Sequence, residues 1–198
     1  MSNPYESGQH VYIKDPSGRL GSSGITEFHF PYTPTITSIS SANYSSYDPT
    51  HSNFQQRAFE MSANTELTIA APIVIENEIE ARTILRAMQF FRGAMKMNFG
   101  KNDDSRGLPP PILRFYANNV YQNVPVLIRD FTYNMDADVD YIEFTDGGGE
   151  DSSGGTHRLP VVSNFVLSLT TTYSPKNVRE NFTLQKYLNG SLRSDGYV

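Results

Sequence analysis

One stretch, residues 71–100, constrains the fold more than any other because it alone carries sustained helical periodicity. Asn77 suits the N-cap of a helix, and Glu80 stands three residues later, where a capping-box glutamate reaches back toward the cap. Acidic residues lie near the start of the stretch and basic residues near its end, the order that the helix dipole favours. The sequence therefore predicts an amphipathic helix over residues 77–97, with Gly100 as its stop.

The apolar residues of this helix recur at spacings of three and four, which places them on one face. We expect four of them to be buried: Ile84, Leu85, Met88 and Phe91. Every later segment has the pattern of strands, so the helix has a β-structure to pack on. The sequence thus predicts an α+β, mainly β fold, a β-sandwich or barrel with one flanking amphipathic helix, in which the helix lies across the outside or end.

Composition supports this fold class and excludes several functions. Tyr and Phe number 12 each and charged residues make up only 19 % of the 198-residue chain, a composition that favours strands within a single domain. The net charge of −5 argues against a general nucleic-acid binder. The absence of cysteine excludes disulfides and thiolate metal sites. Without a signal peptide or an apolar run of membrane-spanning length, we expect a soluble, non-secreted protein.

The pattern along the chain predicts a flexible N-terminal arm over residues 1–24, a β domain over residues 25–190 and a C-terminal tail over residues 191–198. Strands are expected over residues 25–40, where prolines confine the strand to an edge, and then over residues 54–69, 112–117, 124–135, 139–144 and 159–173.

The best of these strands, residues 124–135, alternates Leu127, Phe131, Tyr133 and Met135 on one face with Val126, Ile128 and Asp130 on the other. Residues 41–53 are expected to form a polar loop. Residues 101–107 and 147–157 are polar, glycine-containing connections, and together with the N-terminal arm they are expected to be mobile until a partner orders them.

The densest acidic segment offers the best candidate for a metal site, and the pattern argues against it. Its carboxylates are Asp136, Asp138, Asp140 and Glu143. The D-x-D-x-D spacing opens an EF-hand loop, but Tyr141 stands where that loop needs glycine and Gly147 where it needs glutamate. A solvated turn accounts for the same spacing. We therefore expect no metal site.

No pattern indicates catalysis. The four histidines lack ligand spacing: His10, His29, His51 and His157. No nucleophile elbow, phosphate-binding loop, zinc-protease motif or dinucleotide fingerprint is present. We expect no catalytic residue, no cofactor and no enzyme activity; the alternative is a hydrolase that uses the carboxylates of residues 136–143, recognisable by buried, converging acids with raised pKa values.

Five short motifs, in order, resemble those of the tube-initiator and tail-tube proteins of contractile-tail phage baseplates, including T-even-type phages. They are A-x-x-I-L-x-x-x-x-F-x-R at residues 81–92, G-x-P-P-P-x-L at 107–113, N-V-P-V-x-I at 123–128, D-x-D-Y-I at 138–142 and F-x-L-x-x-Y-x-x-G at 182–190. The resemblance covers about residues 54–190.

This resemblance implies a structural virion protein of a phage tail, assembled in the host cytoplasm. It implies a homohexameric ring that starts the tail tube on the baseplate hub, with adjacent tube rings, tape measure and sheath proteins as further partners. DNA is expected to pass through the lumen without specific binding, and no membrane is involved. Ring closure would also cover exposed sheet edges.

Two other functions stay open at this point. The first is the major tail-tube protein itself, which the same resemblance allows. The second, of another class, is a carbohydrate- or receptor-binding β-module, suggested by tyrosines in or near loops: Tyr44, Tyr47, Tyr116 and Tyr121. A groove in which these rings converge would favour the binding module, whereas pairing or docking between chains would favour the tube.

Overall fold

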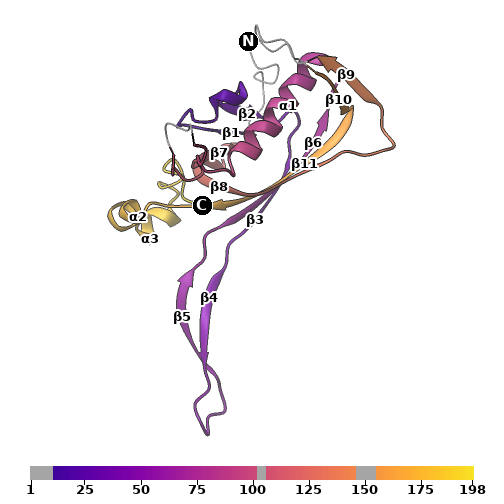
Figure 1. The fold of residues 1–198 in the computed structure, drawn as a ribbon. Coiled ribbons are helices and arrows are strands. Elements are labelled where there is room, and N and C mark those ends of the chain that lie inside the picture. The colour runs from indigo at the N-terminus through magenta and orange to yellow at the C-terminus, as the bar shows by residue number, and fades with distance from the viewer. Residues whose placement is uncertain (1–10, 102–105, 146–154) are drawn as a thin grey trace.

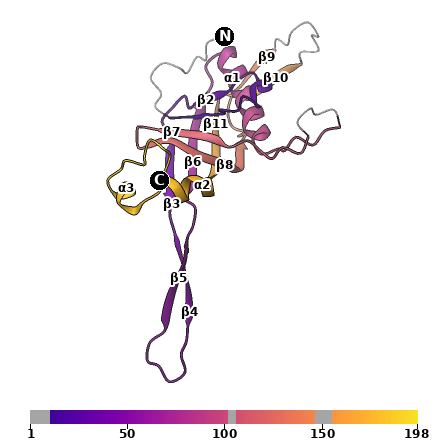
Figure 2. The same ribbon diagram turned by 90° about the vertical axis from the view of Figure 1, so that its left-hand side faces the viewer.

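The computed structural model describes residues 11–101, 106–145 and 155–198, which form a body with one long projecting arm (Figure 1). The body is built on a seven-stranded antiparallel sheet in the order β2-β1-β7-β8-β11-β6-β3. The helix α1 (Glu78–Gly93) lies against one face of this sheet (Figures 1 and 2). The predicted α+β, mainly β fold class with one flanking amphipathic helix is confirmed.

In sheet order the strands are β2 (Glu27–His29), β1 (Val11–Lys14), β7 (Leu113–Ala117), β8 (Tyr121–Asn134), β11 (Val162–Thr171), β6 (Glu66–Val74) and β3 (Thr35–Ile39). Two further hairpins stand apart from this sheet, β4 (Ala42–Tyr47) with β5 (Gln56–Ser62), and β9 (Tyr141–Thr145) with β10 (Thr156–Pro160). The remaining elements are a 3₁₀ turn, η1 (Gly21–Ser23), and two short C-terminal helices, α2 (Pro175–Asn181) and α3 (Leu184–Leu188).

The start of α1 follows the sequence closely, whereas its end does not. Asn77 is the N-cap, and its side-chain oxygen accepts a hydrogen bond from the Glu80 amide at 3.0 Å. The Glu80 carboxylate reaches back to the amide of Glu76 at 2.8 Å, one residue beyond the cap itself. The helix ends at Gly93 and not at residue 97, because glycine is a poor helix former and ends the run here.

The apolar stripe of α1 packs on the sheet through phenylalanine rings. Phe91 is fully buried, and its ring centroid lies 5.3 Å from that of Phe28, 5.3 Å from that of Phe131 and 6.1 Å from that of Phe165. These partners come from three different strands of the sheet. Phe91 therefore ties the helix to both the middle and the edge of the sheet.

The predicted burial of the stripe is confirmed for Ile84, Met88 and Phe91. Leu85 is only partly buried, which corrects the expectation for that residue. It follows Ile84 by one position, and a step of about 100° along a helix moves it to the margin of the stripe. Ala81 and Ala87 are fully buried instead, because small side chains let the helix approach the sheet closely.

Strand β8 contains an irregularity that the alternating sequence did not predict. Its register against β11 shifts at Arg129, so that Ile128 pairs with Leu169 and Asp130 pairs with Ser168. A β-bulge of this kind reverses which face successive residues point to. Val126 and Ile128 consequently face the core, on the same side as Phe131, and the expectation that they lie on opposite faces was wrong.

The N-terminal boundary of the domain also differs from expectation. Within the predicted arm over residues 1–24, strand β1 pairs with β2 on one side and with β7 on the other. Val11 and Ile13 are buried in the core. Asp15 is 3 % exposed, and its carboxylate accepts hydrogen bonds from the amides of Ser17 and Leu20 at 2.9 Å. Residues 11–24 therefore belong to the folded body, and residues 1–10 lie outside the described residues.

Three strand boundaries are corrected as well. Residues 71–74 belong to β6 and precede the helical segment. The strand expected over residues 159–173 is divided at Val161, so that β10 pairs with β9 while β11 joins the main sheet. Residues 41–53 are not a polar loop throughout, because β4 occupies residues 42–47 and pairs with β5.

The C-terminal residues continue the folded body. Leu192 is 4 % exposed, Val198 packs against the core, and Tyr197 stacks on Tyr173 with ring centroids 4.8 Å apart. The predicted separate tail over residues 191–198 is thus corrected. Residues 102–105 and 146–154, which carry most of the two connections expected to be mobile, lie outside the described residues.

Replacement of Phe91 by alanine tests the packing of α1. We expect Phe91→Ala to lower the free energy of unfolding by about 3–5 kcal/mol, because the change leaves a cavity among buried rings. Chemical denaturation measures this loss. The matched control is Phe54→Ala, since Phe54 is 82 % exposed and its loss is expected to leave stability nearly unchanged. Equal stability of both variants would rule out this packing.

Candidate interaction surfaces

The most unusual feature of the molecule is a two-stranded arm, residues 41–64, that extends from the body (Figures 1 and 2). Every residue of β4 and β5 is exposed. The two strands continue the course of β3 and β6, and they leave the sheet where Ser40 and Thr65 join their hydroxyl groups in a hydrogen bond of 3.0 Å. Beyond this point neither face of the hairpin packs on the described residues of the body.

Both faces of the arm carry large apolar side chains. Tyr44 lies opposite Phe59 on one face, and their rings meet edge to face with centroids 5.7 Å apart. Tyr47 lies on the other face, three residues after Tyr44. Met61 lies there too, because the register shifts next to Phe59 and pairs Met61 with Asn43. The tip carries Phe54. The exposed fractions of these five large apolar side chains are between 53 % and 82 %.

This arrangement explains why the hairpin was predicted only in part: the strand expected over residues 54–69 contains β5, whereas β4 fell in an expected loop. An exposed hairpin has no buried face, so its sequence shows no alternation of apolar and polar residues. Its signal was limited to the β-forming side chains Tyr44, Tyr47 and Phe59 within a run of serine and asparagine. An isolated two-stranded hairpin is only marginally stable in water, so a partner that covers this one would stabilise it.

A second surface is the face of the main sheet opposite α1. Its central strands present small polar side chains such as Thr68, Thr132 and Ser168, with one exposed ion pair between Arg129 and Glu66. The sheet is open, because β2 and β3 at its two ends do not pair with each other. As far as the described residues go, both edge strands therefore offer unpaired backbone groups for association with another strand.

A column of stacked rings lies on the same face across β2, β1 and β7. Tyr12 stacks on His29 at 4.8 Å and on Tyr116 at 4.5 Å between ring centroids. Burial raises the pKa of Tyr12, and the neighbouring Tyr116 raises it further. Burial also acts to raise the pKa of Glu27 beside this column, but Lys14 and His29 outweigh it and hold that pKa below its usual value.

The predicted acidic segment forms the turn between β8 and β9. Asp136, Asp138 and Asp140 are exposed, and the Tyr141 hydroxyl donates a hydrogen bond to the Asp136 carbonyl at 2.9 Å. Glu143 lies in β9 and pairs with Arg158. In residues 11–101, 106–145 and 155–198, no group of three or more potential ligands is placed to hold a metal ion. That the protein binds no metal stays a prediction.

The histidines do not converge. His29 lies 3.5 Å from the Glu27 carboxylate within the stacked column, His51 is at the arm tip, and His157 packs on Phe144 in the β9–β10 hairpin. His10 falls outside the described residues. The His29–Glu27 pair is the only histidine–carboxylate ion pair in the described ranges, and Lys14 shares its carboxylate.

The tyrosines proposed for a carbohydrate site are also dispersed. Tyr44 and Tyr47 lie on opposite faces of the arm. Tyr116 is covered by Tyr12, and Tyr121 packs on Phe115 at the edge of the core. These four rings therefore form no common platform on which a sugar could stack.

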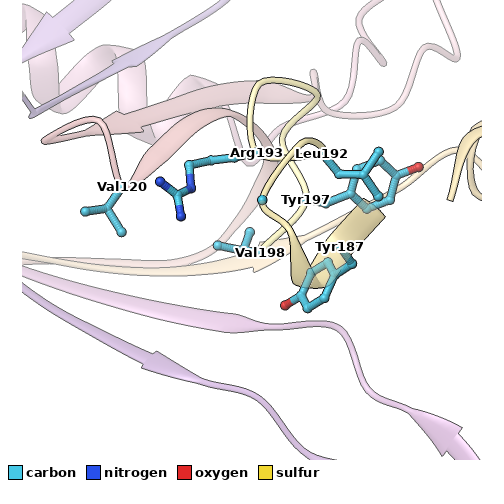
Figure 3. Close-up of a pocket in the computed structure, with 7 residues that line it drawn as sticks. Val120, Tyr187, Leu192, Arg193, Tyr197 and Val198 are labelled. Carbon is cyan, nitrogen blue, oxygen red and sulfur yellow. The ribbon is translucent and has the colours of Figure 1, made fainter. Parts of the chain in front are cut away.

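A cavity of about 270 Å³ lies between the β7–β8 turn and the C-terminal residues (Figure 3). Its lining consists of Val120, Tyr187, Gly190, Leu192, Arg193, Tyr197 and Val198. Figure 3 shows the Arg193 side chain reaching toward Val120. Beside it, burial raises the pKa of Tyr173, whose hydroxyl accepts a hydrogen bond from the Val198 amide at 3.3 Å. The cavity thus lies at the boundary between the C-terminal residues and β8.

Gly196 lets the C-terminal residues pack closely on β8. It has a φ of +87°, and a β-carbon added to it would lie 2.9 Å from the Pro125 side chain and against the Asn123 carbonyl. Gly196→Ala must therefore displace the C-terminal residues from β8. We expect faster hydrogen exchange over residues 191–198 in this variant and unchanged exchange in β11.

The control is Gly190→Ala, which has a similar φ of +76° but meets only the Arg193 side chain at 3.8 Å. It introduces comparable backbone strain without the clash. Exchange over residues 191–198 that is equal in the two variants would show that the close approach at Gly196 is not what holds these residues.

Comparison with known proteins leaves the family of this chain undecided. No protein-family model matches the sequence. No curated protein matches it either. Among solved structures, it is similar to a chain from the tail of an empty GTA particle with C6 symmetry, at 10 % identity and a TM-score of 0.35, over 88 % of this chain and 96 % of that chain. A likeness at this TM-score carries no argument about function.

None of the helices in the described ranges is both long and apolar enough to cross a membrane.

Proposed function

We propose that this protein is a structural subunit of a phage tail, and that copies of it associate into a ring. The observation that carries this proposal is the arm, on which Tyr44, Tyr47, Phe59 and Met61 are all exposed. A fold in which two strands extend from the sheet, uncovered by any of the described residues, is suited to contact another molecule. The five motifs that resemble those of tail-tube proteins indicate that the molecule contacted by the arm is a neighbouring subunit.

The physical argument for a ring rests on unequal surfaces. The arm, the open edges at β2 and β3, and the C-terminal helices are different from one another, so contacts between copies need not be self-complementary. Such heterologous contacts generate either a closed ring or an open filament. A ring that presents unlike upper and lower faces can stack into a tube.

We further propose, from the resemblance, a six-fold ring at the baseplate-proximal start of the tube, which nucleates tube polymerisation on the hub. Its other partners would be adjacent tube rings, the tape measure and sheath proteins, and its location would be the virion, after assembly in the host cytoplasm. DNA would pass through the lumen unbound. The net charge of −5 supports this last point, because it disfavours adhesion of phosphate groups.

The major tail-tube protein is the second candidate, since the arm and the unequal surfaces suit it equally. The two differ in the extent of assembly. A starter ring stops at one layer in the absence of other tube proteins, whereas a major tube protein stacks upon itself without limit. The carbohydrate-binding alternative gains no support, because its four tyrosines do not converge. That the protein has no enzymatic activity remains part of this proposal.

The double variant Tyr44→Ser/Phe59→Ser tests the role of the arm. Both rings lie on one exposed face, so we expect the monomer to keep its stability to within about 1 kcal/mol. Self-association is expected to be lost, because the variant removes the largest apolar contacts that the arm offers. Sedimentation velocity over a range of protein concentrations measures this.

The matched control is Ile112→Ser, which removes an apolar side chain that is 48 % exposed on the body. It should associate like the unmodified chain. If the arm variant also assembles normally, the arm is not the contact we propose and its exposure needs another explanation.

A further inference from the structure

The two ends of strand β8 carry surfaces of opposite charge, and both are exposed. One is the acidic turn, residues 135–141, which follows β8 directly. The other is the pair of basic helices, residues 175–189, which comprises α2 and α3. Figure 1 shows the helices at one end of the body and the connection from β8 to β9 at the other.

The acidic turn has charges without partners and apolar flanks. Asp136, Asp138 and Asp140 are exposed, and none of the ion pairs among the described residues includes them. Met135 and Tyr141 on either side of them are 53 % and 41 % exposed. The turn therefore combines three free carboxylates with two exposed apolar side chains.

The basic helices have the complementary character. They contain three basic residues, Lys176, Arg179 and Lys186, and one acidic residue, Glu180. Their net charge is +2, in a chain whose total is −5. The ion pairs of the described ranges include none of these side chains. No residue of α2 or α3 is buried. Their exposed apolar side chains are Val178, Phe182, Leu184, Tyr187 and Leu188.

The two surfaces cannot meet within one copy. The C-terminal residues are fixed at the start of β8, where the Thr172 amide donates to the Pro125 carbonyl at 3.0 Å and Gly196 packs on Asn123. The acidic turn begins after Asn134, at the other end of this 14-residue strand. Nine to eleven residue steps separate these contacts from Asn134, which at about 3.3 Å per residue is roughly 30–35 Å of strand.

We propose that the acidic turn of one copy docks on the basic helices of a second copy. The charges are opposite, both surfaces are apolar as well as charged, and the length of β8 makes the contact necessarily intermolecular. Because the two surfaces differ, each copy contacts one neighbour through its acidic turn and another through its basic helices. The contact therefore repeats head to tail. This inference specifies one contact of the ring proposed above, and it rests on that proposal for the number of copies.

Charge reversal tests the docking. Replacement of Asp136, Asp138 and Asp140 by lysine places like charges in the contact, and so does replacement of Lys176, Arg179 and Lys186 by glutamate. Each variant alone is expected to self-associate at least about tenfold more weakly than the unmodified chain. The chain that carries all six changes restores opposite charges and should recover association. It is the matched control for nonspecific effects of the substitutions.

A second experiment uses the unmodified sequence and does not depend on any variant folding. A mixture of ¹⁵N-labelled and unlabelled chains is treated with a carbodiimide, which joins a carboxylate to a lysine amine in contact. Mass spectrometry is expected to find mixed-isotope links between the acidic turn and Lys176 or Lys186. Absence of such links, or failure of the six-change chain to recover association, would overturn the proposal.

The outcomes separate this docking from the ring itself. If rings form and neither charge reversal affects them, the proposed function stands and the docking is wrong. If the mixed links form but the particles are open chains or dimers, the docking stands and the ring is wrong. Binding of a divalent cation by the turn in place of a second copy would appear as stoichiometric metal in the purified chain and would count against the docking.

Discussion

The packing of α1 on the main sheet is the interaction on which the rest of the structure depends. Phe91 joins Phe28 of β2 to Phe131 of β8 and Phe165 of β11, so one side chain of the helix holds strands that lie on both sides of β1 and β7. Within the described ranges, no helix covers the opposite face of the sheet. One helix thus completes the core, and the opposite sheet face, the sheet edges, the arm and the C-terminal helices all stay at the surface.

These remaining surfaces are what support the proposal that the molecule assembles with other copies. The arm has no buried face, and α2 and α3 contain no buried residue. Within one chain such elements gain little from the hydrophobic effect. Their apolar side chains become useful when a neighbour covers them. Three different exposed surfaces on one small body suit heterologous contacts, which form rings and filaments.

The sequence predicted those elements in which burial leaves a pattern. The N-cap at Asn77 and the stripe around Phe91 followed from local physics. The arm was predicted only in part, because water surrounds it: β5 lies in the expected strand over residues 54–69, and β4 was expected as a loop. The bulge at Arg129 arises from pairing with β11, a long-range contact. The interaction surfaces were therefore harder to predict than the core. The basic helices, which we propose as the docking surface for the acidic turn, could be recognised only once α2 and α3 were placed.

We propose that copies of this chain close into a ring through unlike surfaces. Electron microscopy of the purified protein at increasing concentration tests it most directly. We expect closed particles of six copies around a central channel, with the arm and the C-terminal helices at contacts between copies. A protein that stays monomeric at every concentration, or that forms only two-fold dimers with a single self-complementary contact, would contradict it.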